Sequence, residues 1–456
     1  MLEWILKKLS TLHPASLLLL SYLVTIAVGT GLLMLPLATV SGAIRLIDAL
    51  FTATSAVCVT GLIVVDTGSY FTVFGQIVIL ALIQLGGLGI MTISVTLFQL
   101  IGKKVFFQHR MAMQEVFSHT PREDIYYLLR SIFIFTASVE LAGATLLFFH
   151  WWRSHPAGEA LYLSLFHSIS AFCNAGFALF ANSFIDERGS VLLNVTISGL
   201  IVLGGLGFPV VYELYRRTSD RRRSSRRYSV HTKTVLVTTG LLIVLGAVIL
   251  LITEKNLPQN AGFGERLMTA VFQSITCRTA GFNTVDIGGL NSASLAFMMF
   301  LMYFGASPGS CGGGIKTTTL AVLAAFTWSR LKDRVRVNMF HKSIPQETVA
   351  KSVSVVVLST AIICGALFLI LFSDPAHGSG ALGHQQYLSL LFETISAFGT
   401  VGLSMGATAT LNGIGKLIII VVMIIGRVGV PAFAYIIAGP PPRKGLEYAE
   451  ENLMIG

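Results

Sequence analysis

The chain has 456 residues, 54% of them hydrophobic and only 12% charged, whereas soluble domains carry roughly 25% charged residues. Together with a mean hydropathy of +0.75, this composition excludes a soluble globular enzyme and predicts a chain that lies mostly in lipid. The net charge of +10 is carried by loops between apolar segments. It therefore indicates a membrane protein with a basic face and no nucleic-acid partner.

Seven apolar runs are long enough to be membrane-spanning helices, for which about 20 residues suffice. They are Ala15–Leu37, Tyr70–Ile101, Tyr126–Trp151, Val191–Tyr212, Val235–Thr253, Val349–Phe372 and Lys416–Ala438. The first run exceeds the apolar core of a signal peptide, about 7–15 residues, and other spans follow it, so we interpret it as a retained helix. The five cysteines are scattered without the spacing of a disulfide framework or a metal site.

Basic residues are concentrated in three of the loops. They cluster in Lys103–Arg130, Arg216–Lys233 and Arg330–Lys351, whereas the loops between these are richer in Asp and Glu. The positive-inside rule predicts that the three basic loops and both termini lie in the cytoplasm. We interpret the arginine-rich run Arg216–Ser229 as a juxtamembrane anchor for anionic lipid headgroups or for a cytosolic partner.

Four semi-apolar segments lie between the predicted spans and are too short to cross a membrane. They are Arg45–Val57, Glu159–Phe172, Glu265–Cys277 and Gln385–Phe398. As helices they would each be about 20 Å long, which is enough to enter the bilayer but not to cross it. Such re-entrant half-helices occur only where protein or water satisfies the backbone beyond the helix end.

The four segments are copies of one unit. In each, a phenylalanine is followed four residues later by Ser or Thr, and a glycine follows five or six residues after that. The aligned residues are Phe51/Ser55/Gly61, Phe166/Ser170/Gly176, Phe272/Thr276/Gly281 and Phe392/Ser396/Gly402. A glycine-rich patch begins 24 to 28 residues further on, at Gly86, Gly204, Gly305 and Gly426. Four matches in register predict an internal repeat.

The repeat defines the predicted fold, an all-α membrane protein. Four tandem helix–pore helix–helix repeats surround one pseudo-fourfold pore, and the expected repeats are residues 1–102, 103–228, 229–342 and 343–456. The C-terminal ends of the four half-helices would then point at a common axis. Their unsatisfied carbonyls carry partial negative charge, which favours a cation at that axis.

Four extended segments follow the half-helices, and we refer to them as the filter segments. They are Cys58–Leu62, Cys173–Phe177, Arg278–Phe282 and Gly399–Leu403. Rings of backbone carbonyls can replace the hydration shell of K⁺, and glycine permits the backbone angles that this requires. The side chains beside the glycines are apolar or small, so coordination must come from the backbone. The carboxylate ligands that Ca²⁺ and Mg²⁺ prefer are missing.

The third filter segment departs from the other three. It is one residue shorter between Thr276 and Gly281, and Arg278 stands where the others have Cys or Gly. A guanidinium facing the pore would repel cations. We therefore expect Arg278 to turn outward, toward Asp286 or Glu265.

The stretch Gly305–Ile315 is similar at first sight to a phosphate-binding loop. That motif needs a lysine directly after its last glycine, but Ile315 separates Gly314 from Lys316. Apolar helical segments flank the stretch and place it near the middle of the membrane, where non-helical backbone must line a cavity or be buried in protein. We interpret it as a gate candidate and predict no nucleotide site on this chain.

Two basic residues lie within predicted spans, where each costs about 2.5–3.5 kcal/mol at the membrane centre. Lys316 is explained equally well by snorkelling or a local ion pair as by a functional role. Arg427 lies between Gly426 and Gly429, and Glu140 is its one candidate acidic partner within a span.

The filter segments, "GGGIKTTT" and "IIGRVG" together resemble the Trk/Ktr/HKT superfamily of potassium transporters, with the bacterial KtrB-type membrane subunit as the closest match. The resemblance extends from about Ser16 to Gly456. It implies that each repeat supplies one quarter of a K⁺ filter, built from the filter glycine and the two residues before it. The implied ligands are Val59, Thr60, Gly61, Asn174, Ala175, Gly176, Thr279, Ala280, Gly281, Thr400, Val401 and Gly402.

The resemblance also implies a gate below the filter and a preference for K⁺. The implied gate residues are Gly305, Ala306, Ser307, Pro308, Gly309, Ser310, Cys311, Gly312, Gly313, Gly314, Lys316 and Arg427. In plant relatives a serine in place of the first filter glycine resembles a sodium-preferring filter, so Gly61 favours potassium. Na⁺ is a candidate activator.

The resemblance further implies a homodimer in the bacterial inner (plasma) membrane, in contact with lipids. A cytosolic ring of RCK-type regulatory subunits that binds ATP or ADP is the implied partner. A secondary active solute carrier or a Na⁺/K⁺ symporter is the alternative, although carriers usually have inverted repeats and a midplane site. A membrane enzyme would need clustered His, Cys or carboxylates within spans, and the ten histidines form no such cluster.

Overall fold

Each predicted repeat consists of a first helix, a half-helix and a second helix, and within the described residues the second helix is broken in repeats 2, 3 and 4. The computed structural model describes residues 14–89, 125–219, 228–254, 262–373 and 381–438. Repeat 1 contains α2 (Pro14–Leu33), α3 (Leu46–Val57) and α5 (Val73–Leu88). Repeat 2 contains α8 (Ile125–Trp151), α9 (Ala157–Phe172), α10 (Val191–Gly205) and α11 (Phe208–Ser219). Repeat 3 contains α12 (Val230–Thr253), α13 (Phe263–Thr276), α14 (Ser292–Tyr303) and α15 (Thr317–Leu331). Repeat 4 contains α16 (Gln346–Ser373), α17 (Ala381–Gly399), α19 (Gly413–Val428) and α20 (Val430–Ala438).

The remaining elements are short connections between these helices. They are η1 (Pro36–Ala38), α4 (Thr67–Tyr70), η3 (Ile287–Gly289), α18 (Ala407–Thr410) and an antiparallel hairpin of β1 (Asn338–Met339) and β2 (Lys342–Ser343). Parts of the basic loops Lys103–Arg130 and Arg216–Lys233, and the end of the predicted span Tyr70–Ile101, lie outside the described residues.

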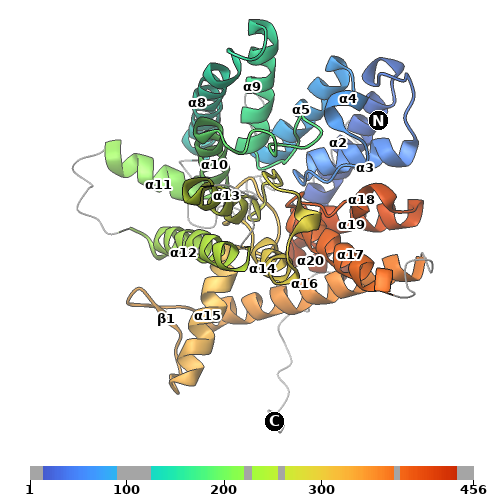
Figure 1. Cartoon of the computed structure of the whole chain (residues 1–456). Helices are drawn as coiled ribbons and strands as arrows, with labels where there is room; N and C mark the ends of the chain where they lie inside the picture. Colours follow the sequence, from blue (N-terminus) through green and yellow to red (C-terminus); the bar gives the residue numbers. More distant parts are fainter. Residues whose placement is uncertain (1–13, 90–124, 220–227, 255–261, 374–380, 439–456) are drawn as a thin grey trace, which may run out of the picture.

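The four repeats are arranged in a ring around a central group of loops (Figure 1). The second helix of each repeat packs against the half-helix of the next repeat. The pairs are α5 with α9, α10 with α13, α14 with α17, and α19 with α3. Because the last pair joins repeat 4 to repeat 1, the chain closes on itself and the half-helices surround one axis.

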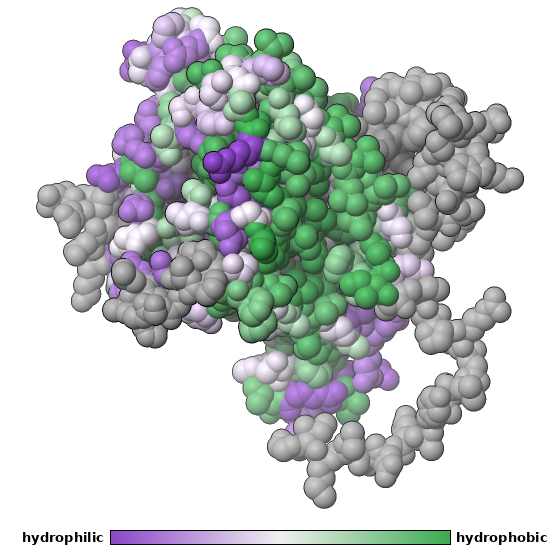
Figure 2. Space-filling model, turned by 90° about the vertical axis from the view of Figure 1, so that its right-hand side faces the viewer, coloured by the Kyte–Doolittle hydropathy of each residue, from purple (hydrophilic) through white to green (hydrophobic). Residues whose placement is uncertain are grey.

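The outer surface is apolar, as expected for a protein in lipid. Among the described residues, four helices are long and apolar enough to cross a membrane, and two bent helix pairs would raise this number to six. Only 28–33% of the residues in the four spans are buried inside the protein, so most of their apolar side chains face outward. Figure 2 shows the result as a belt of hydrophobic residues with hydrophilic residues beside it.

The predicted spans Val191–Tyr212 and Lys416–Ala438 are wrong as straight helices. The chain bends by 98° between α10 and α11, and by 107° between α19 and α20. Gly207 and Gly429 lie at the two bends with φ of +90° and +95°. A glycine with positive φ is the usual end of an α-helix, so glycine conformation ends each helix inside a run that is otherwise apolar.

The glycine-rich patch of each repeat allows its second helix to approach its half-helix. A Cβ added to Gly86, Gly204 or Gly426 would collide with a carbonyl oxygen at the end of the half-helix in its own repeat. Those oxygens belong to Val57, Phe172 and Phe398. The recurrence of glycine is therefore explained by close backbone packing, since only glycine leaves room for the carbonyl.

A buried ion pair joins the last repeat to the first. Lys416 Nζ, on α19, lies 2.7 Å from Asp48 Oδ1, on α3, and the two side chains are only 12% and 13% exposed. Burying two charges is costly, and removing one partner leaves the other uncompensated. The pair therefore makes the closure of the ring sensitive to either residue.

Replacing Lys416 with methionine should destabilise the folded protein by about 3–5 kcal/mol, because Asp48 would stay buried without its partner. The double variant Asp48→Asn/Lys416→Met should regain most of this loss. Thermal unfolding of the purified protein measures both effects. Lys351→Met is the matched control, since Lys351 and Glu347 are 74% and 78% exposed and such pairs contribute about 0–1 kcal/mol. If Lys416→Met unfolds at the wild-type temperature, the pair has no role in ring closure.

Candidate functional site

The four filter segments meet at the centre of the ring. A Cβ added to any filter glycine would lie 3.0–3.2 Å from the Cα of the filter glycine in the next repeat. Each added Cβ would also lie too close to a carbonyl oxygen of the next repeat, that of the residue just before its filter glycine. The contacts run from Gly61 to Ala175 and Gly176, from Gly176 to Ala280 and Gly281, from Gly281 to Val401 and Gly402, and from Gly402 to Thr60 and Gly61. All twelve predicted filter residues therefore lie in segments that form one closed ring.

The backbone of the filter segments has the same unusual conformation four times. The filter glycines have φ between +70° and +92°. The residue two positions before each glycine also has a positive φ, between +50° and +73°, and these residues are Val59, Asn174, Thr279 and Thr400. Positive φ is strained for any of them and is rarest for a β-branched residue. A strain that recurs at one position in four repeats indicates a functional requirement on the backbone.

The recurring Ser or Thr of each half-helix hydrogen-bonds to its own filter segment. In repeats 1 and 4 the hydroxyl accepts from the glycine N–H, and in repeats 2 and 3 it donates to the carbonyl after the glycine. The bonds are Gly61 N to Ser55 Oγ (3.0 Å), Gly402 N to Ser396 Oγ (3.1 Å), Ser170 Oγ to Phe177 O (2.7 Å) and Thr276 Oγ1 to Phe282 O (2.6 Å). These bonds hold the strained backbone and explain why the pattern recurs in the sequence.

The shorter third repeat is accommodated in the turn before its filter segment. In repeats 1, 2 and 4 the middle filter residue donates to a carbonyl five residues earlier, as Thr60 N does to Ser55 O at 2.8 Å. In repeat 3 Ala280 N donates to Thr276 O, four residues earlier, at 3.0 Å. The missing residue tightens the turn, and Gly281 keeps its place in the ring.

Arg278 turns away from the filter, but its expected acidic partners are wrong. Its side chain is buried, and Nη2 donates to Thr239 Oγ1 on α12 at 3.3 Å. Glu265 pairs instead with Arg188 at 3.3 Å, and Asp286 accepts from the backbone N–H of Gly288 at 3.1 Å. Arg278 stands two residues after the end of the half-helix, and it faces α12, the first helix of its own repeat, and not the outer loops.

The segment Gly305–Ile315 connects α14 to α15 and lies against the filter segments. Its two ends are adjacent, because Phe304 and Ile315 form an isolated parallel bridge. Gly305 and Gly312 pack against the side chain of Thr279, and Gly313 N donates to Thr400 Oγ1 at 2.8 Å. Thr279 and Thr400 are the first predicted ligand positions of their filter segments, so the loop lies at the end of the ring nearest the half-helices.

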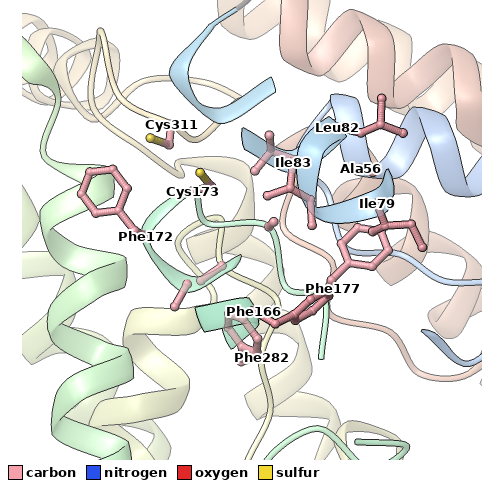
Figure 3. Packing of buried hydrophobic residues seen from close by; sticks show 14 of the residues in the cluster. Ala56, Ile79, Leu82, Ile83, Phe166, Phe172, Cys173, Phe177, Phe282 and Cys311 are labelled. Atoms are coloured by element: carbon pink, nitrogen blue, oxygen red, sulfur yellow. The ribbon is translucent and has the colours of Figure 1, made fainter. Parts of the chain in front are cut away.

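The same loop is bonded to the broken second helices of repeats 2 and 4. Ser307 N and Cys311 N donate to Gly205 O and Gly204 O at 3.2 and 3.1 Å, and Gly314 N donates to Gly426 O at 3.1 Å. Phe208 N at the start of α11 donates to Gly309 O at 2.9 Å. Figure 3 shows Cys311 of the loop beside Cys173, which begins the second filter segment. The loop therefore depends on borrowed hydrogen-bond partners.

Two basic side chains complete the attachment of the loop. Arg427 donates through Nη1 to Cys311 O and through Nη2 to Gly86 O, and its Nε donates to Tyr22 Oη at 3.3 Å. Lys316 Nζ donates to Gly312 O at 2.7 Å and to Gly313 O at 3.3 Å. Arg427 thus links the loop to repeat 1, so that the loop is connected to all four repeats.

Glu140, the candidate acidic partner of Arg427, has other partners in the structure. Glu140 Oε2 accepts from Gln84 Nε2 at 3.3 Å, and its backbone carbonyl accepts from Ser168 Oγ at 2.6 Å. The charge of Arg427 is instead compensated by the backbone carbonyls of Cys311 and Gly86. The sequence had no signal for Tyr22 as a further partner.

Within the described residues, no group of three or more His, Cys, Asp or Glu side chains could hold a metal ion. The oxygen atoms that lie against the four filter glycines are backbone carbonyls, those of Thr60, Ala175, Ala280 and Val401. The site can accept a desolvated monovalent cation in the way that carbonyl rings do.

Comparison with known proteins assigns the family. The family model described as TrkH, a cation transport protein, matches residues 21–439. The chain belongs to the TrkH cation transport family. It is 39% identical over 442 residues to the Ktr system potassium uptake protein B of Vibrio alginolyticus, covering 96% of this chain and 94% of that protein. It is 35% identical over 452 residues to the potassium/sodium uptake protein NtpJ of Enterococcus hirae, covering 98% of both chains.

The fold of the TrkH family is also found in a solved structure. The potassium transporter TrkH from Vibrio parahaemolyticus superposes with a TM-score of 0.71 at 18% identity, covering 94% of this chain and 84% of that chain. The predicted class of an all-α membrane protein is confirmed. Membership of the TrkH family also makes this chain a cation transporter and not an enzyme.

Proposed function

We propose that this TrkH-family chain takes up potassium through a channel-like pore whose selectivity filter is the ring of filter segments. The observation that carries the proposal is the fourfold recurrence of strained, glycine-containing backbone around one axis. The twelve ligands would be the filter glycines and the two residues before each of them. The names of the two relatives, a potassium uptake protein and a potassium/sodium uptake protein, support K⁺ as the transported ion and leave Na⁺ as a candidate activator.

Glycine at all four filter positions supports a preference for potassium. A backbone ring gives uniform carbonyl ligands, whereas a side chain in the ring would change their spacing. A Na⁺/K⁺ symporter is the second candidate, because one relative carries both ions in its name. The two candidates differ in whether K⁺ flux requires a sodium gradient.

The loop Gly305–Gly314, with Lys316 and Arg427, would be the gate. It lies across one end of the filter and uses hydrogen bonds from four repeats. A segment held by borrowed partners can leave when those partners move, which is the property a gate needs. The same chemistry argues against a nucleotide site, since the loop carbonyls already bind two cationic side chains.

We also place the protein in the bacterial inner membrane as a homodimer with both termini in the cytoplasm. A cytosolic RCK-type ring that binds ATP or ADP would regulate it. The basic loops and the similarity of this chain to a Ktr system potassium uptake protein support these proposals.

Replacing Arg427 with alanine should raise potassium uptake by about threefold, because the loop loses its link to repeat 1. If opening required only the loss of one charge-assisted hydrogen bond, which contributes about 1.5–3 kcal/mol, uptake would rise more than tenfold. We expect a smaller rise, because the backbone bonds from the loop to Gly204, Gly205 and Gly426 still hold the loop in place. Uptake by cells of a strain that lacks its own potassium transporters measures this, with protein levels matched. Arg188→Ala is the control, because its bond to Glu265 involves no residue of the loop. Reduced uptake by well-expressed Arg427→Ala would contradict the gate.

The transport proposal is tested most simply in the same strain. Expression of this chain should restore growth at limiting potassium, and intracellular K⁺ should rise. Growth restored only when sodium is present would favour the symporter. Failure of a well-expressed chain to restore growth, both alone and with a regulatory subunit of a Ktr system, would contradict potassium uptake.

A further inference from the structure

An amphipathic groove lies between α15, the β1–β2 hairpin and the beginning of α16, away from the pore. It has a volume of about 600 Å³, within the range of small-molecule sites. The groove is lined by Phe326, Arg330, Val335, Arg336, Val337, Ser343, Ile344, Pro345, Gln346, Val349, Ala350, Val353 and Ser354. Figure 1 shows the hairpin projecting beside α15, at the edge of the helical ring.

The floor of the groove is apolar and its rim is basic. Buried Val337 and Val349 pack with Phe326 and Ile344 as a small hydrophobic cluster of their own. Arg336 has no hydrogen-bond or ion-pair partner among the described residues, and Arg330 contacts only the Phe326 ring, at 5.3 Å. The lining contains no carboxylate. The nearby acids are Asp333, which lies outside the lining, and Glu347, which pairs with Lys351 at 2.7 Å.

The start of α16 adds a second feature that suits an anion. Pro345, Gln346 and Val349 bring the first turn of this 28-residue helix into the groove. The first N–H groups of a helix lack intrahelical acceptors and carry partial positive charge, which favours phosphate. Two guanidinium groups that have no acidic partner among the described residues, and a helix N-terminus, thus line the same groove.

The groove continues onto the lipid-facing side of α16. Val353 belongs to the lining and is 38% exposed, and Val357, one turn further along, is 64% exposed. Near the end of α15, Trp328 is 60% exposed, and aromatic residues of this kind mark the membrane–water interface. A molecule in the groove can therefore place a charged end among the arginines and an apolar end along the membrane span.

We propose that this groove binds an anionic phospholipid, with its phosphate at Arg330 and Arg336 and its acyl chains along α16. Basic pockets between membrane helices are a known form of headgroup site. A cytosolic protein would use the arginines but not the apolar path along Val353 and Val357. The proposal depends only on insertion of the chain in a membrane, so its failure would leave the pore proposal unaffected.

The test uses purified full-length protein equilibrated with equal amounts of phosphatidylglycerol and phosphatidylcholine in detergent, with bound lipids counted by native mass spectrometry. Wild type should retain phosphatidylglycerol in preference. Arg330→Ala and Arg336→Ala should each lower its retention by about fivefold, the effect of one basic residue at an anionic surface. Arg334→Ala removes the same charge four residues away from Arg330 but outside the lining, and it should retain the lipid as wild type does.

Two further measurements separate the lipid from other ligands. Ala350→Trp fills the groove without changing the charge, and it should also reduce retention of phosphatidylglycerol. Glycerol 1-phosphate, which has the headgroup chemistry without acyl chains, should not displace the lipid at equal concentration. Equal loss in Arg334→Ala, displacement by glycerol 1-phosphate, or equal retention of phosphatidylcholine by wild type would each overturn the proposal. Variants are compared only when they elute as the wild-type species on size exclusion.

Discussion

Replacing Gly402 with serine should lower the preference for potassium over sodium by about tenfold, which corresponds to roughly 1.4 kcal/mol. Gly402 has φ of +92°, and a Cβ there would collide with the carbonyl oxygen of Thr60 and lie 3.0 Å from the Cα of Gly61. Serine must therefore displace a carbonyl of the neighbouring repeat. Gly61→Ser should act in the same direction, since its Cβ would meet the carbonyl of Ala175. Flux of K⁺ and of Na⁺ in the reconstituted protein measures the ratio.

Gly406→Ser is a matched control for this experiment. Gly406 also has a positive φ, +88°, but an added Cβ there meets nothing within 4 Å. The two substitutions thus impose a similar backbone strain, of about 1–2 kcal/mol. Only the serine at position 402 would contact the ring of filter segments. Gly406→Ser should keep wild-type selectivity. A folded Gly402→Ser protein with unchanged selectivity would exclude Gly402 from the filter.

Deletion of Ala306–Gly313 should raise uptake by about tenfold or more while leaving the potassium preference unchanged. If the loop adds a free-energy barrier of only about 1.4 kcal/mol to ion passage, its removal already raises the rate of uptake tenfold. Because Phe304 and Ile315 form a parallel bridge, Gly305 and Gly314 lie at opposite ends of this pair, and joining them breaks the bridge and rearranges the backbone at the two glycines. Uptake in the potassium-transport-deficient strain should also become less dependent on any cytosolic partner.

The selectivity measurement serves as the internal control for the deletion. An open gate leaves the filter intact, so K⁺ must still be preferred to Na⁺ in the deleted protein. A damaged filter would raise the flux of both ions. Loss of flux in well-folded deletion protein would remove the gate assignment and would instead fit a loop that is essential for transport.

The repeats and the half-helices could be predicted because their signals are local. Half-helices α3, α9, α13 and α17 are short and semi-apolar, and each is followed by a glycine at nearly the same distance. The break before Lys316 was also visible, since proline and five glycines cannot continue a helix without cost. These features depend on residue type and spacing, which a sequence contains.

The partners of the buried charges could not be predicted, because they are mostly backbone atoms. Arg427 bonds to the carbonyls of Cys311 and Gly86, and no residue type marks which carbonyls will accept such a bond. Arg278 bonds to a threonine on the preceding helix, where an acid was expected. The bends at Gly207 and Gly429 were missed for a related reason, since single glycines within apolar runs do not reveal a positive φ.

The role of the repeated Ser or Thr was present in the sequence but not interpreted. Ser55, Ser170, Thr276 and Ser396 form a pattern in the sequence, and their hydrogen bonds to the filter segments appear only in the fold. A hydroxyl at the end of each half-helix could have been assigned to the strained turn that follows it, since Ser and Thr commonly bond to nearby backbone.

The central claim is that a backbone ring in this chain conducts and selects potassium, and flux into liposomes that contain the purified protein tests it most directly. Uptake of radioactive rubidium is followed while unlabelled K⁺ or Na⁺ is added outside. We expect K⁺ to compete strongly and Na⁺ weakly, with flux that needs no sodium gradient and a weakened K⁺ preference in Gly402→Ser. Equal competition by the two ions, or rubidium flux that occurs only with a sodium gradient, would contradict the account.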